Sequence, residues 1–223
     1  MNDRKKLAFV FSSSILVVLI MSLIEGVFQP GYLIKSLCKV VLMLGSIVFY
    51  SFHTRKKVRD VIHLALRLPN RKLVFFVLGV YLFILAVYFI FKSHIDLSSI
   101  KESLLVKEHL SKANYLLIFG YIAFVNSFLE EIFFRGFISG VFKETKKAKL
   151  GYLYSALLFA LYHIGIVSHW FHWWIYLLCI LGLVVAGGFL QWITEKNDNI
   201  LASYLTHAAA NLAINTIGIL MMA

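Results

Sequence analysis

Long apolar stretches separated by short polar segments dominate the chain. Seven of them approach the roughly 20 residues that an α-helix needs to cross a bilayer. They are Leu7–Phe28, Tyr32–Phe52, Leu73–Phe91, Tyr115–Phe142, Leu150–Val167, Trp173–Trp192 and Ile200–Met222. Because lipid offers no hydrogen-bond partners, a spanning backbone must satisfy its own polar groups, which favours helices. The pattern predicts an all-α, polytopic transmembrane bundle of about seven spans, with residues 1–223 as a single integral membrane domain.

Three polar or aromatic segments between the spans predict contacts with the membrane surface. Within Arg55–Leu68, apolar residues fall on one helical stripe and most basic residues lie off it, as in a helix resting on anionic lipid. Ser93–Lys112 has a similar pattern with balanced charge. We expect both to form interfacial amphipathic helices. His169 and His172 lie among aromatic residues, which favours an interfacial belt over a metal site.

Composition agrees with a protein that is embedded in lipid. The chain is 61% hydrophobic and 15% charged, whereas soluble proteins carry about 25% charged residues. Its mean hydropathy is +0.83. The first apolar stretch begins after basic residues, as a signal peptide does, but it is long and lacks an A-x-A cleavage site. We therefore expect it to remain as a span.

The distribution of basic residues predicts how the bundle is oriented. With the N-terminus in the cytoplasm, fifteen lie inside: Arg4, Lys5, Lys6, Arg55, Lys56, Lys57, Arg59, Arg67, Arg71, Lys72, Lys143, Lys146, Lys147, Lys149 and Lys196. Six lie outside: Lys35, Lys39, Lys92, Lys101, Lys107 and Lys112. The C-terminus is then external. The net charge of +11 is thus mainly a topology signal, and a nucleic-acid partner, which needs a soluble basic face, is not expected.

The fourth stretch contains three charged residues, Glu130, Glu131 and Arg135. Each charge at the bilayer centre costs roughly 2.5–3.5 kcal/mol, so charges there pair with one another or serve a function. Glu131 and Arg135 are four residues apart and share a helical face, whereas Glu130 has no basic neighbour three or four residues away. We expect Glu131 to be paired and Glu130 to be free for chemistry.

Further polar residues on two other spans lie at matching depths. Counted from the basic or polar end of each span at a rise of 1.5 Å per residue, Glu130 lies about 20 Å and His163 about 21 Å from the cytoplasmic surface. His207 and Asn211 lie about 12 Å and about 18 Å from it. Singly, each histidine is as well explained by packing or by hydrogen bonding between helices. Together, these residues predict one buried polar site.

Three short motifs carry a resemblance to a known family. They are Glu-Glu-x-x-x-Arg at residues 130–135, Phe-x-x-x-His at 159–163 and His-x-x-x-Asn at 207–211. All three are intact, in order and on separate spans. The chain resembles the CAAX protease and bacteriocin-processing (Abi) family of intramembrane proteases, relatives of the Ras-converting endopeptidase. The resemblance covers roughly residues 115–222, which form the motif-bearing core of the bundle.

The resemblance implies a water-filled cavity open to the cytoplasm in which a peptide bond is hydrolysed. Glu130 would be the general base, and His163 would hold and polarise the attacking water. His207 with Asn211 would stabilise the oxyanion, while Glu131 and Arg135 support the site. Glu130, His163 and His207 are also a donor set for zinc. The asparagine beside them favours an oxyanion site without metal, so no cofactor is expected to be required.

Substrate and function class are inferred by analogy with the family. We expect hydrolysis of a small peptide precursor, such as a leader, pheromone or bacteriocin peptide, or of a membrane-associated protein, in a bacterial plasma membrane. One alternative is a non-proteolytic member that acts in bacteriocin self-immunity or binds a regulatory partner. Another is a proton-coupled transporter that uses the same buried residues as a relay. The intact motifs favour the protease.

Overall fold

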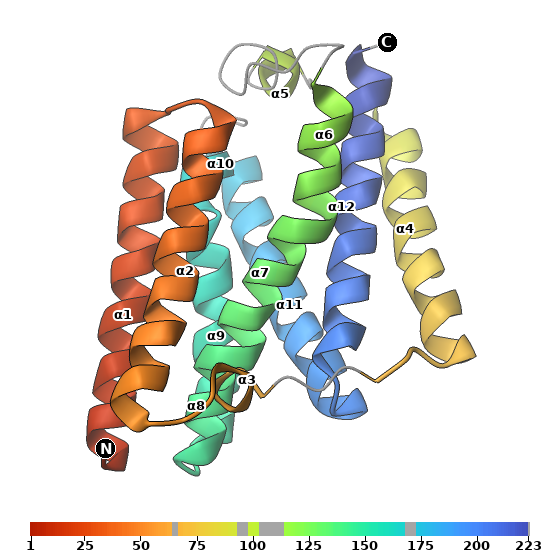
Figure 1. The fold of residues 1–223 in the computed structure, drawn as a ribbon. Coiled ribbons are helices and arrows are strands. Elements are labelled where there is room, and N and C mark those ends of the chain that lie inside the picture. The colour runs from red at the N-terminus through yellow and green to blue at the C-terminus, as the bar shows by residue number, and fades with distance from the viewer. Residues whose placement is uncertain (64–66, 93–97, 103–113, 168–172, 223) are drawn as a thin grey trace.

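The computed structural model describes residues 1–63, 67–92, 98–102, 114–167 and 173–222, and these residues form helices and turns without a strand. The N-terminal half contains α1 (Asp3–Leu23), η1 (Ile24–Phe28), α2 (Tyr32–Thr54), α3 (Val58–Val61), α4 (Arg71–Phe91) and α5 (Ser98–Glu102). The C-terminal half contains α6 (Tyr115–Gly120), η3 (Tyr121–Asn126), α7 (Ser127–Glu131), η4 (Ile132–Ile138), α8 (Ser139–Glu144), α9 (Ala148–Tyr162), α10 (Ile164–Val167), α11 (Trp173–Asn197) and α12 (Ile200–Met222). Figure 1 shows them as one helical bundle. The all-α prediction is confirmed.

The helices account for the predicted spans. Five segments are long and apolar enough to cross a membrane: Asp3–Phe28, Tyr32–Thr54, Arg71–Phe91, Tyr115–Glu144 and Tyr176–Asn197. Ala148–Tyr162 is a shorter apolar helix, and the 23-residue α12 packs against α4 and α11. Together these seven segments agree with the expectation of about seven spans.

Large apolar side chains face outward from several helices. Phe52 on α2, Phe75 on α4 and Leu117 on α6 are 79%, 72% and 78% exposed. A soluble monomer rarely exposes so much contiguous apolar surface, whereas lipid tails solvate it. The buried core lies instead between α1, α2, the α7–α8 segment and α9. The outer surface therefore suits a bilayer, and the inner contacts hold the helices together.

The stretch Leu150–Val167, predicted as one span, is formed by two helices, because α9 ends at Tyr162 and the short α10 follows. His163 lies at the break, with φ −85° and ψ −6°. The break lets Gly165 approach α1 closely, since a Cβ atom at this glycine would lie 3.1 Å from the carbonyl oxygen of Ser22. Irregular backbone inside a membrane protein is tolerated where protein buries it. His163 therefore occupies a helix end inside the bundle.

The amphipathic helix expected over Arg55–Leu68 is also corrected, because the helix found there, α3, spans only Val58–Val61. Val61 and Ile62 are buried, and Ile62 and His63 lie against two glycines of the long central segment. A Cβ atom at Gly136 would meet the carbonyl oxygen of Ile62 at 2.6 Å, and one at Gly140 would overlap the ring of His63. The segment therefore turns into the bundle after one helical turn, although residues 64–66 lie outside the described part.

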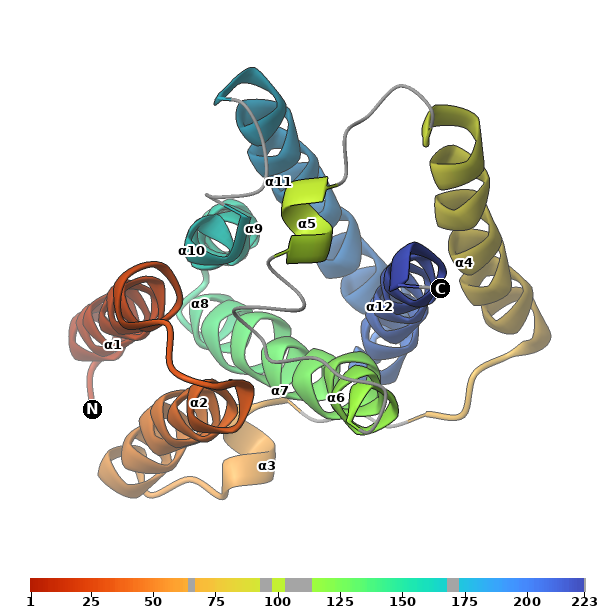
Figure 2. The same cartoon turned by 90° about the horizontal axis from the view of Figure 1, so that it is seen from above.

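The expected outer cover over Ser93–Lys112 is described only in α5. Figures 1 and 2 show this short helix above one end of the bundle, as predicted for an interfacial cover, while residues 93–97 and 103–113 lie outside the described residues. The aromatic segment with His169 and His172 lies outside them too.

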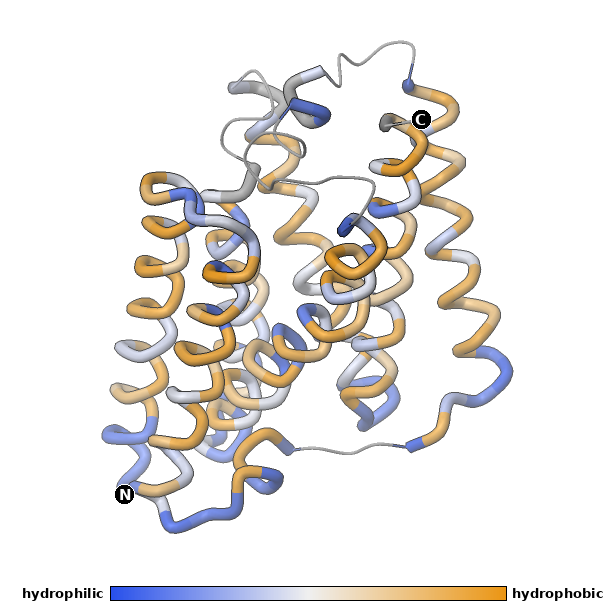
Figure 3. The backbone as a smooth tube through the Cα atoms, turned by 45° about the horizontal axis from the view of Figure 1, so that its top comes forward, coloured by the Kyte–Doolittle hydropathy of each residue, from blue (hydrophilic) through white to orange (hydrophobic). Residues whose placement is uncertain are grey.

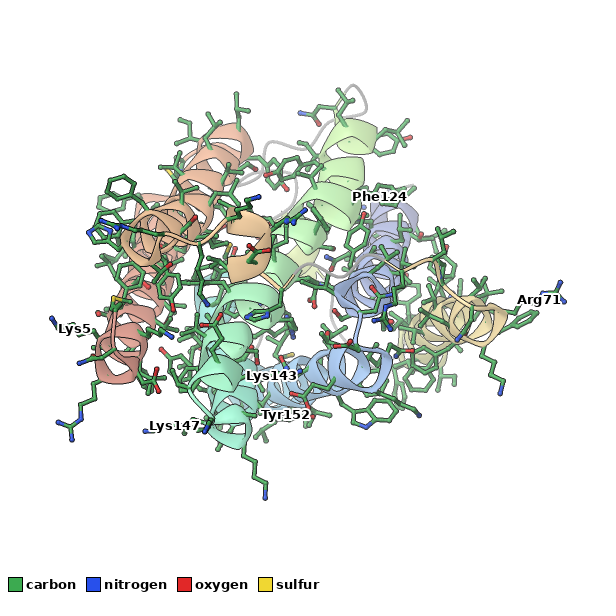
Figure 4. The ribbon with its side chains drawn as sticks, turned by 60° about the horizontal axis from the view of Figure 1, so that its bottom comes forward. Lys5, Arg71, Phe124, Lys143, Lys147 and Tyr152 are labelled. Carbon is green, nitrogen blue, oxygen red and sulfur yellow. The ribbon has the colours of Figure 1, made fainter. Side chains whose placement is uncertain are left out.

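Basic residues gather at the end of the bundle where the N-terminus lies. Figure 3 shows hydrophilic segments at this end below a largely hydrophobic middle. Lys5, Arg71 and Lys147, from separate parts of the chain, point away from the bundle there (Figure 4), and Lys143 is exposed. This arrangement agrees with the charge distribution used to orient the chain, and the assignment of this end to the cytoplasm stays a prediction.

Two of the lysines assigned to the opposite side are not in a loop. Lys35 and Lys39 belong to α2 and are buried, with exposed fractions of 4% and 7%. Their position in the sequence, shortly after the Gln29-Pro30-Gly31 turn, is what suggests an external location. Removing them from the count strengthens the charge bias, because fewer basic residues then oppose the cytoplasmic cluster.

This bias predicts the topology. A reporter fused after Lys57 or Lys147 should read as cytoplasmic, and one fused after Ala223 should read as external, because loops rich in lysine and arginine stay on the cytoplasmic side. Paired alkaline phosphatase and green fluorescent protein fusions measure this. External activity at either internal site would contradict the seven-span orientation.

Candidate functional site

The two adjacent glutamates lie on a short α-helical turn between two π-helical stretches. Residues 115–144 run through α6, η3, α7, η4 and α8, and the five-residue α7 carries both glutamates. Glu130 is 1% exposed and Glu131 is fully buried. π-Helical turns are rare and frequently occur at functional sites. Their presence on both sides of α7 marks this segment as unusual in the bundle.

Glu131 forms the expected ion pair with Arg135. Nη1 of Arg135 donates to Oε1 of Glu131 at 2.9 Å, and neither side chain is exposed. Nη2 donates to the carbonyl oxygen of Gly187 on α11 at 3.1 Å. The guanidinium also lies over the Phe159 ring, 4.4 Å from its centroid, which is a favourable cation–π geometry. The pair thus joins the central segment to α9 and α11.

The prediction that Glu130 is free of a basic partner is wrong. Nζ of Lys39 lies 3.7 Å from Oε1 of Glu130, and Nδ2 of Asn126 donates to the same oxygen at 2.8 Å. Helical spacing considers only neighbours on one helix, and Lys39 comes from α2. Glu130 is therefore also charge-paired, but through a different helix.

Two histidines face the second oxygen of Glu130. Nε2 of His163 lies 3.9 Å and Nε2 of His207 lies 3.7 Å from Oε2. Each ring is fixed through its other nitrogen: Nδ1 of His163 contacts the carbonyl oxygen of Phe159 at 2.7 Å, and Nδ1 of His207 contacts Oε1 of Glu131 at 2.9 Å. The predicted meeting of residues from three spans is found for these groups.

The hydrogen-bond roles of the two rings follow from their partners. A carbonyl oxygen and a carboxylate only accept, so Nδ1 carries the proton in both histidines. In a neutral ring Nε2 is then an acceptor. Oε2 of Glu130 is an acceptor too, and it is buried without a hydrogen-bond partner among the described residues. Three acceptors converge on one place. They need a donor between them, which is either a proton on one ring or a molecule that donates, such as water.

Asn211 lies beside this cluster rather than in it. Its Nδ2 donates to the hydroxyl of Ser127 at 2.8 Å and makes a longer contact of 3.5 Å to the carbonyl oxygen of Ile122. Ser127 begins α7, so Asn211 attaches α12 to the start of the segment that carries the glutamates. Of the predicted site residues, Arg135, Glu131, His207, Glu130 and His163 are linked by successive contacts in that order. Asn211 adjoins them through Ser127.

Sequence reasoning missed two polar residues of the site. Nζ of Lys39 donates to Oδ1 of Asn126 at 2.6 Å, and Asn126 in turn donates to Glu130. Signals for both were present: a lysine within an apolar stretch is costly unless it has a partner, and Asn126 precedes Glu130 by four residues, on the same helical face. The position of the lysine near a turn instead suggests an external loop, and the asparagine belongs to none of the three motifs.

The surroundings of Glu130 and the two histidines test whether these residues suit a zinc ion. Glutamate and histidine are ordinary zinc ligands, but among the described residues no group of three metal-binding side chains has the geometry to hold an ion. The ammonium of Lys39 already supplies a positive charge 3.7 Å from the carboxylate, which opposes a divalent cation. The donor set does not fit zinc in this arrangement. That the site works without metal stays a prediction.

Comparison with known proteins gives a family for the C-terminal part of the chain. Residues 112–213 match the family described as "Type II CAAX prenyl endopeptidase Rce1-like". We call these residues, which make up a little under half of the chain, the CAAX protease segment, because they are similar to this family. The match confirms the resemblance read from the three motifs, and the CAAX protease segment contains all six predicted site residues. No curated protein and no solved structure matches the chain. With the apolar helices of the fold, the match identifies a membrane protein.

The geometry predicts that Glu131 is needed for folding. Glu131→Gln leaves the guanidinium of Arg135 buried without its counter-charge, a defect that costs about 3–5 kcal/mol in buried pairs. We expect a lower yield of folded protein and a clear loss of thermal stability in detergent.

Asp198→Asn is the matched control, because Asp198 forms an exposed pair with Arg67 at 3.5 Å and exposed pairs contribute little. Thermal unfolding of both variants and wild type decides the matter. Equal melting temperatures for Glu131→Gln and Asp198→Asn would show that the buried pair is not required.

Proposed function

We propose that this protein is an intramembrane endopeptidase in which Glu130 activates a water molecule for attack on a peptide carbonyl. The observation that supports this most directly is the buried Oε2 of Glu130, which has no hydrogen-bond partner among the described residues and faces Nε2 of His163 and His207 at 3.9 and 3.7 Å. A water molecule placed there can donate one proton to Oε2 of Glu130 and the other to Nε2 of His163. Its lone pairs then remain available for attack.

In this mechanism Glu130 is the general base. It takes a proton from the water as the oxygen attacks the carbonyl carbon, and it passes this proton to the leaving amine when the C–N bond breaks. His163 holds the water through Nε2, and its ring is kept in place by the Phe159 carbonyl. The reaction thus needs no covalent intermediate.

His207 and Asn211 stabilise the oxyanion of the tetrahedral intermediate. When its Nε2 is protonated, His207 becomes a donor to the oxyanion, and Glu131, bonded to Nδ1 at 2.9 Å, balances the resulting positive charge. An asparagine amide has two donor hydrogens, and Ser127 accepts one of them in Asn211. The other is held only by the 3.5 Å contact with Ile122, so a substrate oxygen can displace that contact. Donors aimed at a developing charge are a major source of catalysis.

The proposed substrate is a peptide precursor or a membrane-associated protein. The matching family is described as a type II CAAX prenyl endopeptidase, whereas the analogy with bacterial members favours a leader, pheromone or bacteriocin peptide. A panel of internally quenched peptides separates these classes. It contains a peptide that ends in a prenylated Cys-a-a-X sequence, the same peptide without the lipid, and peptides that carry bacterial leader sequences.

The proposal predicts the effect of Glu130→Gln on cleavage. Glutamine keeps an oxygen that accepts from Asn126, but it cannot take a proton. Because the change also removes the counter-charge of Lys39, cleavage is compared at equal amounts of folded protein. We expect cleavage of the responsive peptide to fall by at least 10²-fold, the usual minimum for loss of a general base.

Glu25→Gln serves as the control, because Glu25 is a carboxylate that pairs with another buried lysine, Lys35, at 3.1 Å and has no role in the mechanism. It should cleave normally. A zinc chelator should leave wild-type cleavage intact if the site works without metal. Binding without cleavage by wild type would favour the regulatory or immunity function, and normal cleavage by Glu130→Gln would exclude Glu130 as the base.

A further inference from the structure

Helix α2 carries two lysines into the interior of the bundle. Lys35 and Lys39 are four residues apart, share one helical face and are both buried. Each has an acidic partner: Lys35 lies 3.1 Å from Glu25, and Lys39 lies 3.7 Å from Glu130. A lysine inside a membrane protein is costly and is retained for pairing or function. Only Lys39 reaches the cluster proposed to carry out catalysis.

Lys39 and Asn126 form a closed triangle with Glu130. Lysine can only donate, so the atom of Asn126 that lies 2.6 Å from Nζ must be the amide oxygen. The amide nitrogen then faces Glu130 and donates to Oε1 at 2.8 Å. The lysine therefore fixes which way the asparagine amide points, and with it the hydrogen bond that the asparagine gives to Glu130.

This triangle separates the roles of the two carboxylate oxygens. Oε1 receives the hydrogen bond from Asn126 and the charge of Lys39, whereas Oε2 faces the histidines. Lys39 is itself held in place, because its ammonium lies 5.4 Å from the centroid of the Tyr162 ring, a cation–π distance. The arrangement holds the carboxylate with one oxygen directed at the catalytic histidines.

We propose that Lys39 is a positioning residue for Glu130. Lys39 keeps the carboxylate of Glu130 ionised and directs its Oε2 toward His163 and His207. The helical hairpin of α1 and α2, which lies outside the segment that matches the CAAX protease family, thereby supplies a working part of the site. The catalytic consequence rests on the proposed function, whereas the effect of Lys39 on Glu130 does not.

Several other groups act on Glu130 and must be kept constant in a test. His163 and Tyr162 come from α9 and its end, His207 from α12, Tyr121 from η3, and Arg135 from η4. Glu131 is adjacent in sequence. All of them keep their identity in a Lys39 variant. Lys39→Met also removes the charge beside the Tyr162 ring, whereas Lys39→Arg keeps it, so a matched set of α2 variants isolates the contribution of this charge.

Infrared titration of the purified protein tests the proposal without a substrate. The carbonyl band of protonated Glu130 is identified in wild type and in each lysine variant as the band that disappears when Glu130→Gln is added. An opposite charge within about 4–6 Å favours the ionised carboxylate by about one to three pH units. In Lys39→Met the band should therefore persist to a pH about one to three units higher than in wild type, and Lys39→Arg should return it toward the wild-type position.

Lys35→Met is the control for packing, because it removes a buried, glutamate-paired lysine from the same face of α2. It should leave the Glu130 titration unchanged. An unchanged titration in Lys39→Met, or an equal shift in Lys35→Met, would overturn the proposal and leave Lys39 as a bridge between helices.

Kinetics with the responsive peptide provide the second readout. Lys39→Met should lower kcat by at least 10-fold with little change in KM and should move the acidic limb of the pH–rate profile upward, while Lys39→Arg recovers much of the rate. Loss of rate without the shift would contradict a positioning role. If wild type cleaves no peptide in the panel, the proposed function fails, while the infrared result still decides whether Lys39 acts on Glu130.

Discussion

The buried ion pair between Glu131 and Arg135 is the interaction on which the rest of the site depends. Removing one member would leave the other charge without compensation inside the bundle, which is far more costly than losing an exposed pair. Arg135 also contacts the Gly187 carbonyl on α11 and the Phe159 ring on α9, and Glu131 also receives His207 from α12. One pair therefore fixes four helical segments around Glu130.

Neutralisation of buried charge explains why the two glutamates differ. Glu131 uses a single oxygen to hold both Arg135 and His207, so it is committed to structure and to the orientation of a histidine. Glu130 has one oxygen held by Asn126 and Lys39 and a second that faces two imidazole rings. Both glutamates keep a second oxygen without a hydrogen-bond partner among the described residues, but only that of Glu130 faces the two imidazole rings.

Much of this arrangement could be predicted from the sequence, because its causes are local. Apolar stretches of spanning length predicted the helical bundle, and four-residue spacing predicted the Glu131–Arg135 pair. Depth along each span predicted that Glu130, His163 and His207 would meet, since helical rise is constant. The Asn211 contact with Ser127 was not predicted, because depth does not specify which neighbour a side chain chooses.

The features that could not be predicted depend on contacts between distant segments. The pairing of Lys39 with Glu130 needs the packing of α2 against the central segment. The helix break at His163 arises where its side chain bonds the Phe159 carbonyl and Gly165 packs closely on α1. The short α3 results from burial of Val61 and Ile62, whereas their amphipathic spacing alone predicted a longer surface helix.

The central claim is that Glu130 activates water and does not itself attack the substrate. A single turnover of a responsive peptide in ¹⁸O-water, followed by mass spectrometry of both product and enzyme, tests this most directly. The account predicts one ¹⁸O atom in the new carboxylate of the product and none in Glu130. Label in the Glu130 side chain would show that water had hydrolysed a bond to this carboxylate, and it would contradict the account.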